Sequence, residues 1–154
     1  MPYVPRNHAL TFAQRTRENL DYIERAAKAG DDVHVVTQLA TSLLGLVVFL
    51  REKNFDEAVR GKKLDALVAQ GWPKWEWLLG SCSSLGDLVY HLRNAVAHGH
   101  IDFTSDSRNI EDVAIEVEDY KQNAPAPYWR ARIEAIDLRT FCLRFLDLLE
   151  NEIG

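Results

Sequence analysis

An arginine, an asparagine and a histidine lie close together in the run Leu92–Gly99, which reads LRNAVAHG. The guanidinium of Arg93 presents a planar fork of N–H donors that suits a phosphate group and charge growing on phosphorus. A histidine such as His98 is the usual general acid or base near neutral pH, and Asn94 could orient it or hold a phosphate oxygen. Together these groups could cleave RNA without a metal, because the ribose 2′-hydroxyl can attack the adjacent phosphate. The products would be a 2′,3′-cyclic phosphate and a 5′-hydroxyl end.

This run ends a helix that the sequence predicts from Leu85 to His98. Ser84 and Asp87 form a capping signal at its start, and Gly99 suits the left-handed position that follows a helix. Its apolar residues recur on one stripe and are Leu85, Leu88, Val89, Leu92 and Val96. We expect this stripe to face a hydrophobic core.

A polar strip lies beside the apolar stripe, because residues three or four apart share one face of a helix. Its members are Asp87, His91, Asn94 and His98. Asp87 precedes His91 by one turn and would stabilise its positive charge, so these two residues are candidates for a supporting role. Arg93 lies about 140° around the helix from His98. The two can converge if the helix end frays at Gly99, or if the strip meets its own copy across a two-fold axis.

Each of these residues also has an ordinary structural explanation. His98 can bond the last carbonyl groups of its helix, and Arg93 can be a surface residue that forms a salt bridge. Asn94 is less usual in the middle of a helix, since its intrinsic helix propensity is poor. Judged by physical chemistry alone, the residues favour the structural explanation over catalysis.

Three further helices are predicted from hydrophobic periodicity. Thr11 and Gln14 form a capping box, and the first helix is expected over Phe12–Ala29. The second helix is expected after Asp32, and its apolar residues cover a wide arc, which predicts packing on more than one side. Asp137 is expected to cap the last helix.

The segment between the second and third helices is less regular. Lys63–Gln70 can form a short helix that Gly71 stops. Trp72–Trp77 contains three of the four tryptophans. We predict a loop or short helix there, with indoles that pack over the end of the bundle. A platform on which nucleobases stack is the functional alternative.

After Gly99 the pattern alternates, which predicts strands over 101–104 and 113–118. A third strand fits 129–135, although a helix that starts near Pro127 competes closely. We therefore expect one domain over residues 1–154 with a mainly α fold. It would be an antiparallel four-helix bundle with a small antiparallel β insertion between the third and fourth helices.

The composition narrows the classes of function. The 154 residues carry a formal net charge of −5, which argues against a broad basic surface that binds phosphates. Cys82 and Cys142 cannot form a disulfide framework, and no Cys/His pair has zinc spacing, so we expect no metal or other cofactor. Because no signal peptide or run long enough to cross a membrane is visible, we expect a cytoplasmic protein.

The run Arg93–His98 resembles the active-site motif of HEPN-type ribonucleases, in which an arginine, often followed by a polar residue, precedes a histidine. Further segments look like a bacterial HEPN subfamily of plasmid and defence contexts. They are Leu43–Phe49, Leu88–Leu92, Gly99–Phe103 and Leu138–Phe141. The resemblance implies a helical bundle, homodimerisation through the motif helices and often RNA cleavage. It places Arg93, Asn94 and His98 at the catalytic positions.

One position departs from a known variant of this motif. HEPN toxins with a nucleotidyltransferase antitoxin usually carry a tyrosine two residues after the histidine, where this chain has His100. The departure argues against a modification switch of that kind. We therefore expect a homodimeric, metal-independent endoribonuclease of toxin or defence type, with RNA as substrate and an antitoxin or regulatory protein as a further partner. The alternative is a non-catalytic HEPN-like module that dimerises or binds RNA or a protein.

Overall fold

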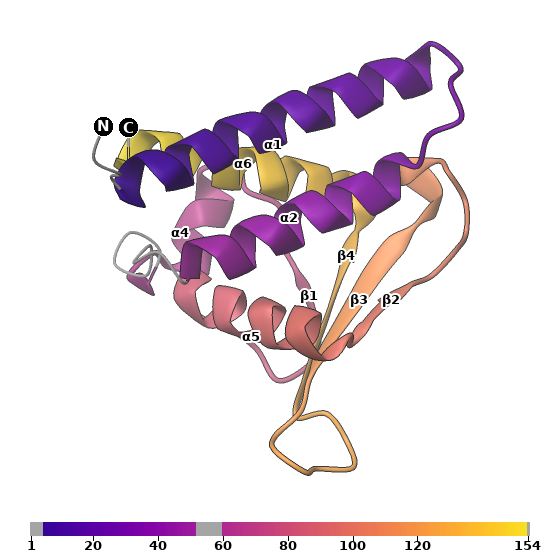
Figure 1. The fold of residues 1–154 in the computed structure, drawn as a ribbon. Coiled ribbons are helices and arrows are strands. Elements are labelled where there is room, and N and C mark those ends of the chain that lie inside the picture. Colours follow the sequence, from indigo (N-terminus) through magenta and orange to yellow (C-terminus); the bar gives the residue numbers. More distant parts are fainter. Residues whose placement is uncertain (1–4, 52–59, 154) are drawn as a thin grey trace.

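The computed structural model describes residues 5–51 and 60–153, which combine helices with an antiparallel sheet (Figure 1). The helices are α1 (Pro5–Lys28), α2 (Val35–Arg51), α4 (Leu64–Ala69), α5 (Leu85–His98) and α6 (Ala135–Ile153). The strands are β1 (Glu76–Leu79), β2 (Ile101–Phe103), β3 (Ala114–Asp119) and β4 (Trp129–Glu134), with a 3-10 turn η1 (Ile110–Asp112). Within this described part, no helix is long and apolar enough to cross a membrane.

The strands form one sheet in the order β1-β4-β3-β2, and every neighbouring pair is antiparallel. The longest pair joins β3 to β4, from Ala114 opposite Glu134 to Asp119 opposite Trp129. Helix α5 packs against β3, and α2 packs against both α5 and α6. The helices therefore cover one face of the sheet, and the core lies between the two layers (Figure 1).

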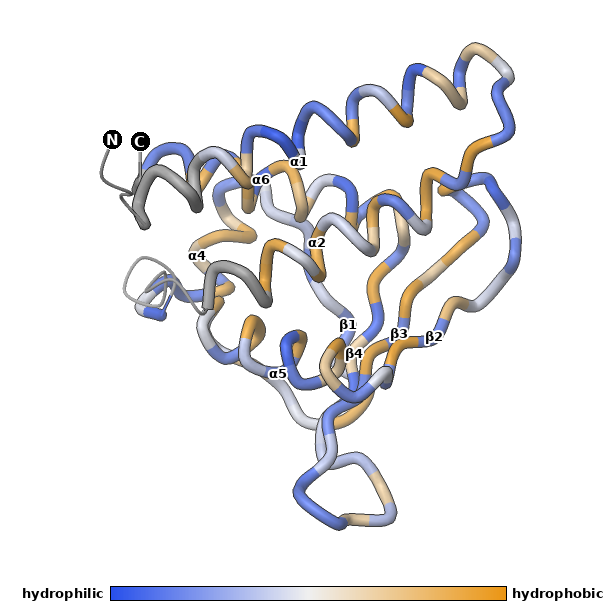
Figure 2. Tube along the Cα trace, viewed as in Figure 1, coloured by the Kyte–Doolittle hydropathy of each residue, from blue (hydrophilic) through white to orange (hydrophobic). Residues whose placement is uncertain are grey.

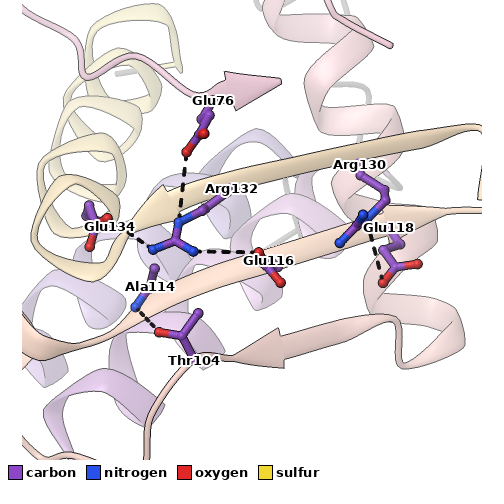
Figure 3. Close-up of polar contacts among 8 residues, drawn as sticks. All are labelled: Glu76, Thr104, Ala114, Glu116, Glu118, Arg130, Arg132 and Glu134. Atoms are coloured by element: carbon purple, nitrogen blue, oxygen red, sulfur yellow. Dashed lines mark hydrogen bonds and ion pairs between the residues drawn. The ribbon is translucent and has the colours of Figure 1, made fainter. Parts of the chain in front are cut away.

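The other face of the sheet carries charged side chains. Arg132 on β4 lies 3.9 Å from Glu76 on β1 and 3.7 Å from Glu116 on β3 (Figure 3). Nε of Arg130 on β4 likewise lies 4.0 Å from Oε1 of Glu118 on β3. These partly exposed pairs add little to stability one by one. They mark this face as the solvent side of the sheet.

The predicted four-helix bundle with a small β insertion is wrong, because the sheet is a full second layer of an α+β fold. The sheet also begins earlier than predicted, since β1 lies within and just after the tryptophan-rich segment 72–77. A strand of four residues shows too little alternation to be recognised. Its partner β4 lies far along the chain, so the pairing that stabilises β1 is invisible to a local pattern.

Several local predictions are confirmed. The segment 129–134 forms the predicted strand, β4, and not the alternative helix that would start near Pro127. The short helix α4 and the strands β2 and β3 also lie where the sequence predicts them. Helix α5 has both predicted caps: the Ser84 side chain accepts a hydrogen bond from the Asp87 N–H, and Gly99 is left-handed, with φ 70° and ψ 24°.

Two helix starts differ from the prediction. Helix α1 begins at Pro5, a residue type that suits the first turn of a helix, so the Thr11–Gln14 pair lies inside it. Helix α6 begins at Ala135, directly after β4, and Asp137 lies in its first turn instead of capping it. In both cases the helix begins before the residues that were predicted to cap it.

The tryptophans of the segment 72–77 act mainly as packing anchors. Trp72 and Trp75 are buried and meet the ring of Phe141 on α6 edge-on, with ring centroids 5.3 and 5.6 Å apart. Trp77 is half-buried and lies 6.2 Å from Trp129. Because the faces of Trp72 and Trp75 are buried in the core, these two rings offer no surface on which a nucleobase could stack.

Candidate functional site

The buried Asp119 lies where the inner face of the sheet ends. Ile115 and Val117 point into the core from β3, and alternation along the strand gives Asp119 the same direction. The side chain of Asp119 is only 3% exposed, which is rare for a carboxylate. A charged group at such a position must be compensated by hydrogen-bond donors.

Three donors from two parts of the chain meet at one oxygen of Asp119. Its Oδ2 lies 2.7 Å from Nδ1 of His91 and 3.1 Å from the amide nitrogen of Asn94, both on α5. The hydroxyl of Tyr128, just before β4, donates to the same oxygen at 3.1 Å. This cluster, which we call the Asp119 cluster, ties α5 to the ends of β3 and β4.

The ring of His91 is enclosed by aromatic side chains. It stacks on Trp129 with ring centroids 4.4 Å apart and an angle of 8° between the planes. Tyr90 and Tyr128 approach it edge-on. Because a carboxylate only accepts hydrogen bonds, Nδ1 is the donor to an ionised Asp119. His91 is thus held in one orientation, and its side chain is only 13% exposed.

Tyr128 is a stable hydrogen-bond donor in this cluster. Partial burial, followed by its hydrogen bond to Asp119 and the charge of that carboxylate, raises the pKa of Tyr128 to about 12. Tyr128 therefore remains a neutral phenol near neutral pH and keeps donating to Asp119.

An open cleft of about 780 Å³ lies beside the Asp119 cluster. It is lined by Asn94 and His98 at the end of α5, by His100 after the turn at Gly99, and by the run Asp119–Ala124. The loop between β3 and β4 projects from the body of the molecule (Figure 1), and its colours are mostly hydrophilic (Figure 2). Imidazoles, amides and Lys121 therefore meet at one polar surface.

The structure brings some of the predicted site residues together. Asn94 and His98 line the cleft side by side, as their spacing on the helix requires. His91 lies behind Asn94, on the same carboxylate. Asn94 and Asp119 therefore belong to both the Asp119 cluster and the lining of the open cleft.

The other two predicted residues lie apart from this cleft. Asp87 is exposed in the first turn of α5, and the carboxylate that contacts His91 is that of Asp119 instead. Arg93 is half-buried on another flank of α5 and does not belong to the described residues that line the cleft. This placement agrees with the large angle between Arg93 and His98 on a straight helix.

Asp119, Tyr128 and the loop that lines the cleft were not predicted from the sequence as site residues. The sequence did contain a sign of Asp119. It lies two residues after Val117 and four after Ile115, so the alternation of the strand predicts a carboxylate that points inward. Tyr128 had none, since it joins the cluster only through the pairing of β3 with β4. Lys121 likewise lines the cleft only because of where the loop between β3 and β4 lies.

Neither cysteine carries a reactive thiol. Burial raises the pKa of Cys82 and of Cys142 to about 12, so both remain protonated thiols near neutral pH and are poor nucleophiles. Among the described residues, no three His, Cys, Asp or Glu side chains are grouped so that they could hold a metal ion.

Comparison with known protein families gives a match over the whole chain. The family model described as HEPN pEK499 p136 matches residues 1–154. No curated protein matches the chain, and no solved structure does.

Replacing Tyr128 with phenylalanine should lower the free energy of unfolding by about 1 kcal/mol near pH 7, because one hydrogen bond to Asp119 is lost. Because the pKa of Tyr128 is higher in the folded than in the unfolded protein, the protonated phenol stabilises the folded state. This contribution is complete below pH 10 and disappears as the pH rises towards 12. Urea unfolding of both proteins at a series of pH values measures the difference.

Tyr22→Phe is the matched control, since Tyr22 is 68% exposed on α1. It should leave the free energy of unfolding unchanged at each pH. A difference between wild type and Tyr128→Phe that stays constant or grows above pH 10 would contradict the role of the phenol proton.

Proposed function

The chain belongs to the HEPN pEK499 p136 family, and we propose that it is a metal-independent endoribonuclease of toxin or defence type that acts as a homodimer. The observation that supports the proposal is the cleft at the end of α5. There an exposed imidazole, His98, lies beside an amide, Asn94, that is fixed from behind by a buried carboxylate.

His98 is the general acid and base in this proposal. Its imidazole takes the proton of a ribose 2′-hydroxyl, and the oxygen attacks the adjacent phosphorus. The bond between phosphorus and the 5′-oxygen breaks as the 2′,3′-cyclic phosphate forms. The imidazolium then returns the proton to the departing 5′-oxygen. The step needs neither a metal nor a water molecule as reactant.

Asn94 positions the substrate. Because the Asp119 carboxylate can only accept, the amide nitrogen of Asn94 faces it and the amide oxygen is turned away. The orientation of Asn94 is fixed before substrate binds, which lowers the entropy cost of holding a reacting group. His91 acts through the same carboxylate and supports this arrangement from behind.

Arg93 serves the site of a second copy in this proposal. It lies on another flank of α5 than His98, so one chain does not bring both residues to its own cleft. If two α5 helices pack across a two-fold axis, the guanidinium of one copy reaches the cleft of the other. There it would offset the negative charge that grows on phosphorus.

A non-catalytic module that binds RNA or a protein is the second candidate. The net charge of −5 favours it, because a nuclease that contacts many phosphates usually needs clustered basic residues. This candidate predicts that the wild-type protein cleaves no RNA. An antitoxin or regulatory protein would then be the partner that gives the module its role.

Replacing His98 with alanine should lower the rate of RNA cleavage by at least about 100-fold, because the acid and base is lost. His34→Ala is the matched control, since His34 is an exposed histidine in the turn between α1 and α2. It should keep the wild-type rate. Equal rates for wild type and His98→Ala, both free of contaminating nuclease, would contradict the role of His98.

A shared site also predicts complementation between two inactive variants. Arg93→Ala and His98→Ala should each be inactive as homodimers. After they are mixed and allowed to exchange subunits, heterodimers contain one intact site, and roughly a quarter of the wild-type activity should return. A mixture that stays inactive although subunit exchange is demonstrated would refute the composite site, as would a wild-type protein that sediments as a monomer.

A further inference from the structure

Three rings follow one another along the cleft. The ring centroids of His98 and His100 are 6.0 Å apart, and those of His100 and Tyr120 are 4.5 Å apart. All three residues line the cleft. The proposed chemistry uses the first ring and leaves the other two without a function.

Hydrogen bonds fix the segments that carry these two rings. The N–H of His100 donates to Ala95 on α5 at 2.8 Å, and its carbonyl accepts from Glu118 on β3 at 3.1 Å. The hydroxyl of Tyr120 donates to Oε2 of Glu118 at 3.0 Å. That hydrogen bond raises the pKa of Tyr120, so the ring remains a neutral phenol. The side chain of Tyr120 and the backbone of His100 are therefore held in place without a ligand.

The two rings differ in their exposure from the buried tryptophans of the core. Trp72, Trp75 and Trp129 are buried in the core, whereas His100 and Tyr120 are only partly buried and line open space. Their neighbours suit a nucleotide. Lys121 lies with its ammonium 5.4 Å from the ring centre of Tyr128 and offers a charge for a phosphate.

We propose that His100 and Tyr120 form a stacking site for a nucleobase of single-stranded RNA, next to the bond that His98 cleaves. Nucleobases stack readily on aromatic side chains, and every base has a π-face that can do so. A duplex would not fit this site, because its bases stack on one another and are not free to meet a side chain. The inference rests on the proposed function, since it assigns the substrate to the same cleft.

Binding of short oligomers tests the stacking site apart from cleavage. The probes are a fluorescent oligodeoxyadenylate, which lacks the 2′-hydroxyl and cannot be cleaved by this chemistry, and an abasic oligomer of the same length and charge. Fluorescence anisotropy at fixed salt gives Kd for each. The wild type should bind the base-bearing oligomer about tenfold more tightly, because stacking stabilises the complex.

The variants separate the ring from its hydroxyl group. Tyr120→Ala should lose most of the preference for bases, whereas Tyr120→Phe should keep it because the ring remains. Tyr22→Ala, on α1 and outside the cleft, is the matched control and should behave as the wild type. Circular dichroism and urea unfolding check that each variant is folded.

The outcomes distinguish this inference from the proposed function. Equal affinity of the wild type for the two oligomers, binding of neither, or an unchanged preference in Tyr120→Ala would overturn the stacking site. Cleavage that depends on His98 would still stand in those cases. Conversely, a preference for bases that depends on Tyr120 supports the stacking site even if replacing His98 leaves cleavage unchanged.

Discussion

The hydrogen bonds that meet at the buried carboxylate of Asp119 are the constraint on which the candidate site depends. A carboxylate removed from water is costly unless donors compensate it. Here His91 and Asn94 come from α5, and Tyr128 comes from the start of β4. All three must stay in place together, so the helix cannot slide or rotate on the sheet without breaking the cluster. His98 lies one turn beyond Asn94 on the same helix and lines the cleft. The contact between α5 and Asp119 therefore also fixes the position of His98.

The cleft exists because three chain segments diverge at this point. Helix α5 ends at its left-handed Gly99, β3 ends at Asp119, and the following loop turns away from the sheet (Figure 1). The outer face of the sheet carries ion pairs of Arg130 and Arg132, whereas the end of α5 brings polar groups to an open cleft. A single chain brings imidazole and amide to this place but not Arg93, so the proposed composite site requires a second copy.

Sequence patterns predicted local structure well and long-range pairing poorly. The caps of α5 at Ser84 and Gly99 are local signals, and both were confirmed. The fold class was wrong because β1 is short and depends on β4, whose pairing no local pattern records. Asn94 and His98, which the sequence predicts on one helix face, both line the cleft, while their role in a reaction stays a prediction. Tyr128, in contrast, joins the site only through tertiary structure, as do the loop residues.

Product analysis is the most direct test of the claim that this cleft cleaves RNA through His98 without a metal. The wild-type protein is incubated with single-stranded RNA in EDTA, and the new ends are identified by mass spectrometry. Attack by the 2′-hydroxyl predicts 2′,3′-cyclic phosphate and 5′-hydroxyl ends that form at an undiminished rate. Products with 5′-phosphate and 3′-hydroxyl ends, or cleavage that stops when divalent metal is removed, would contradict the account.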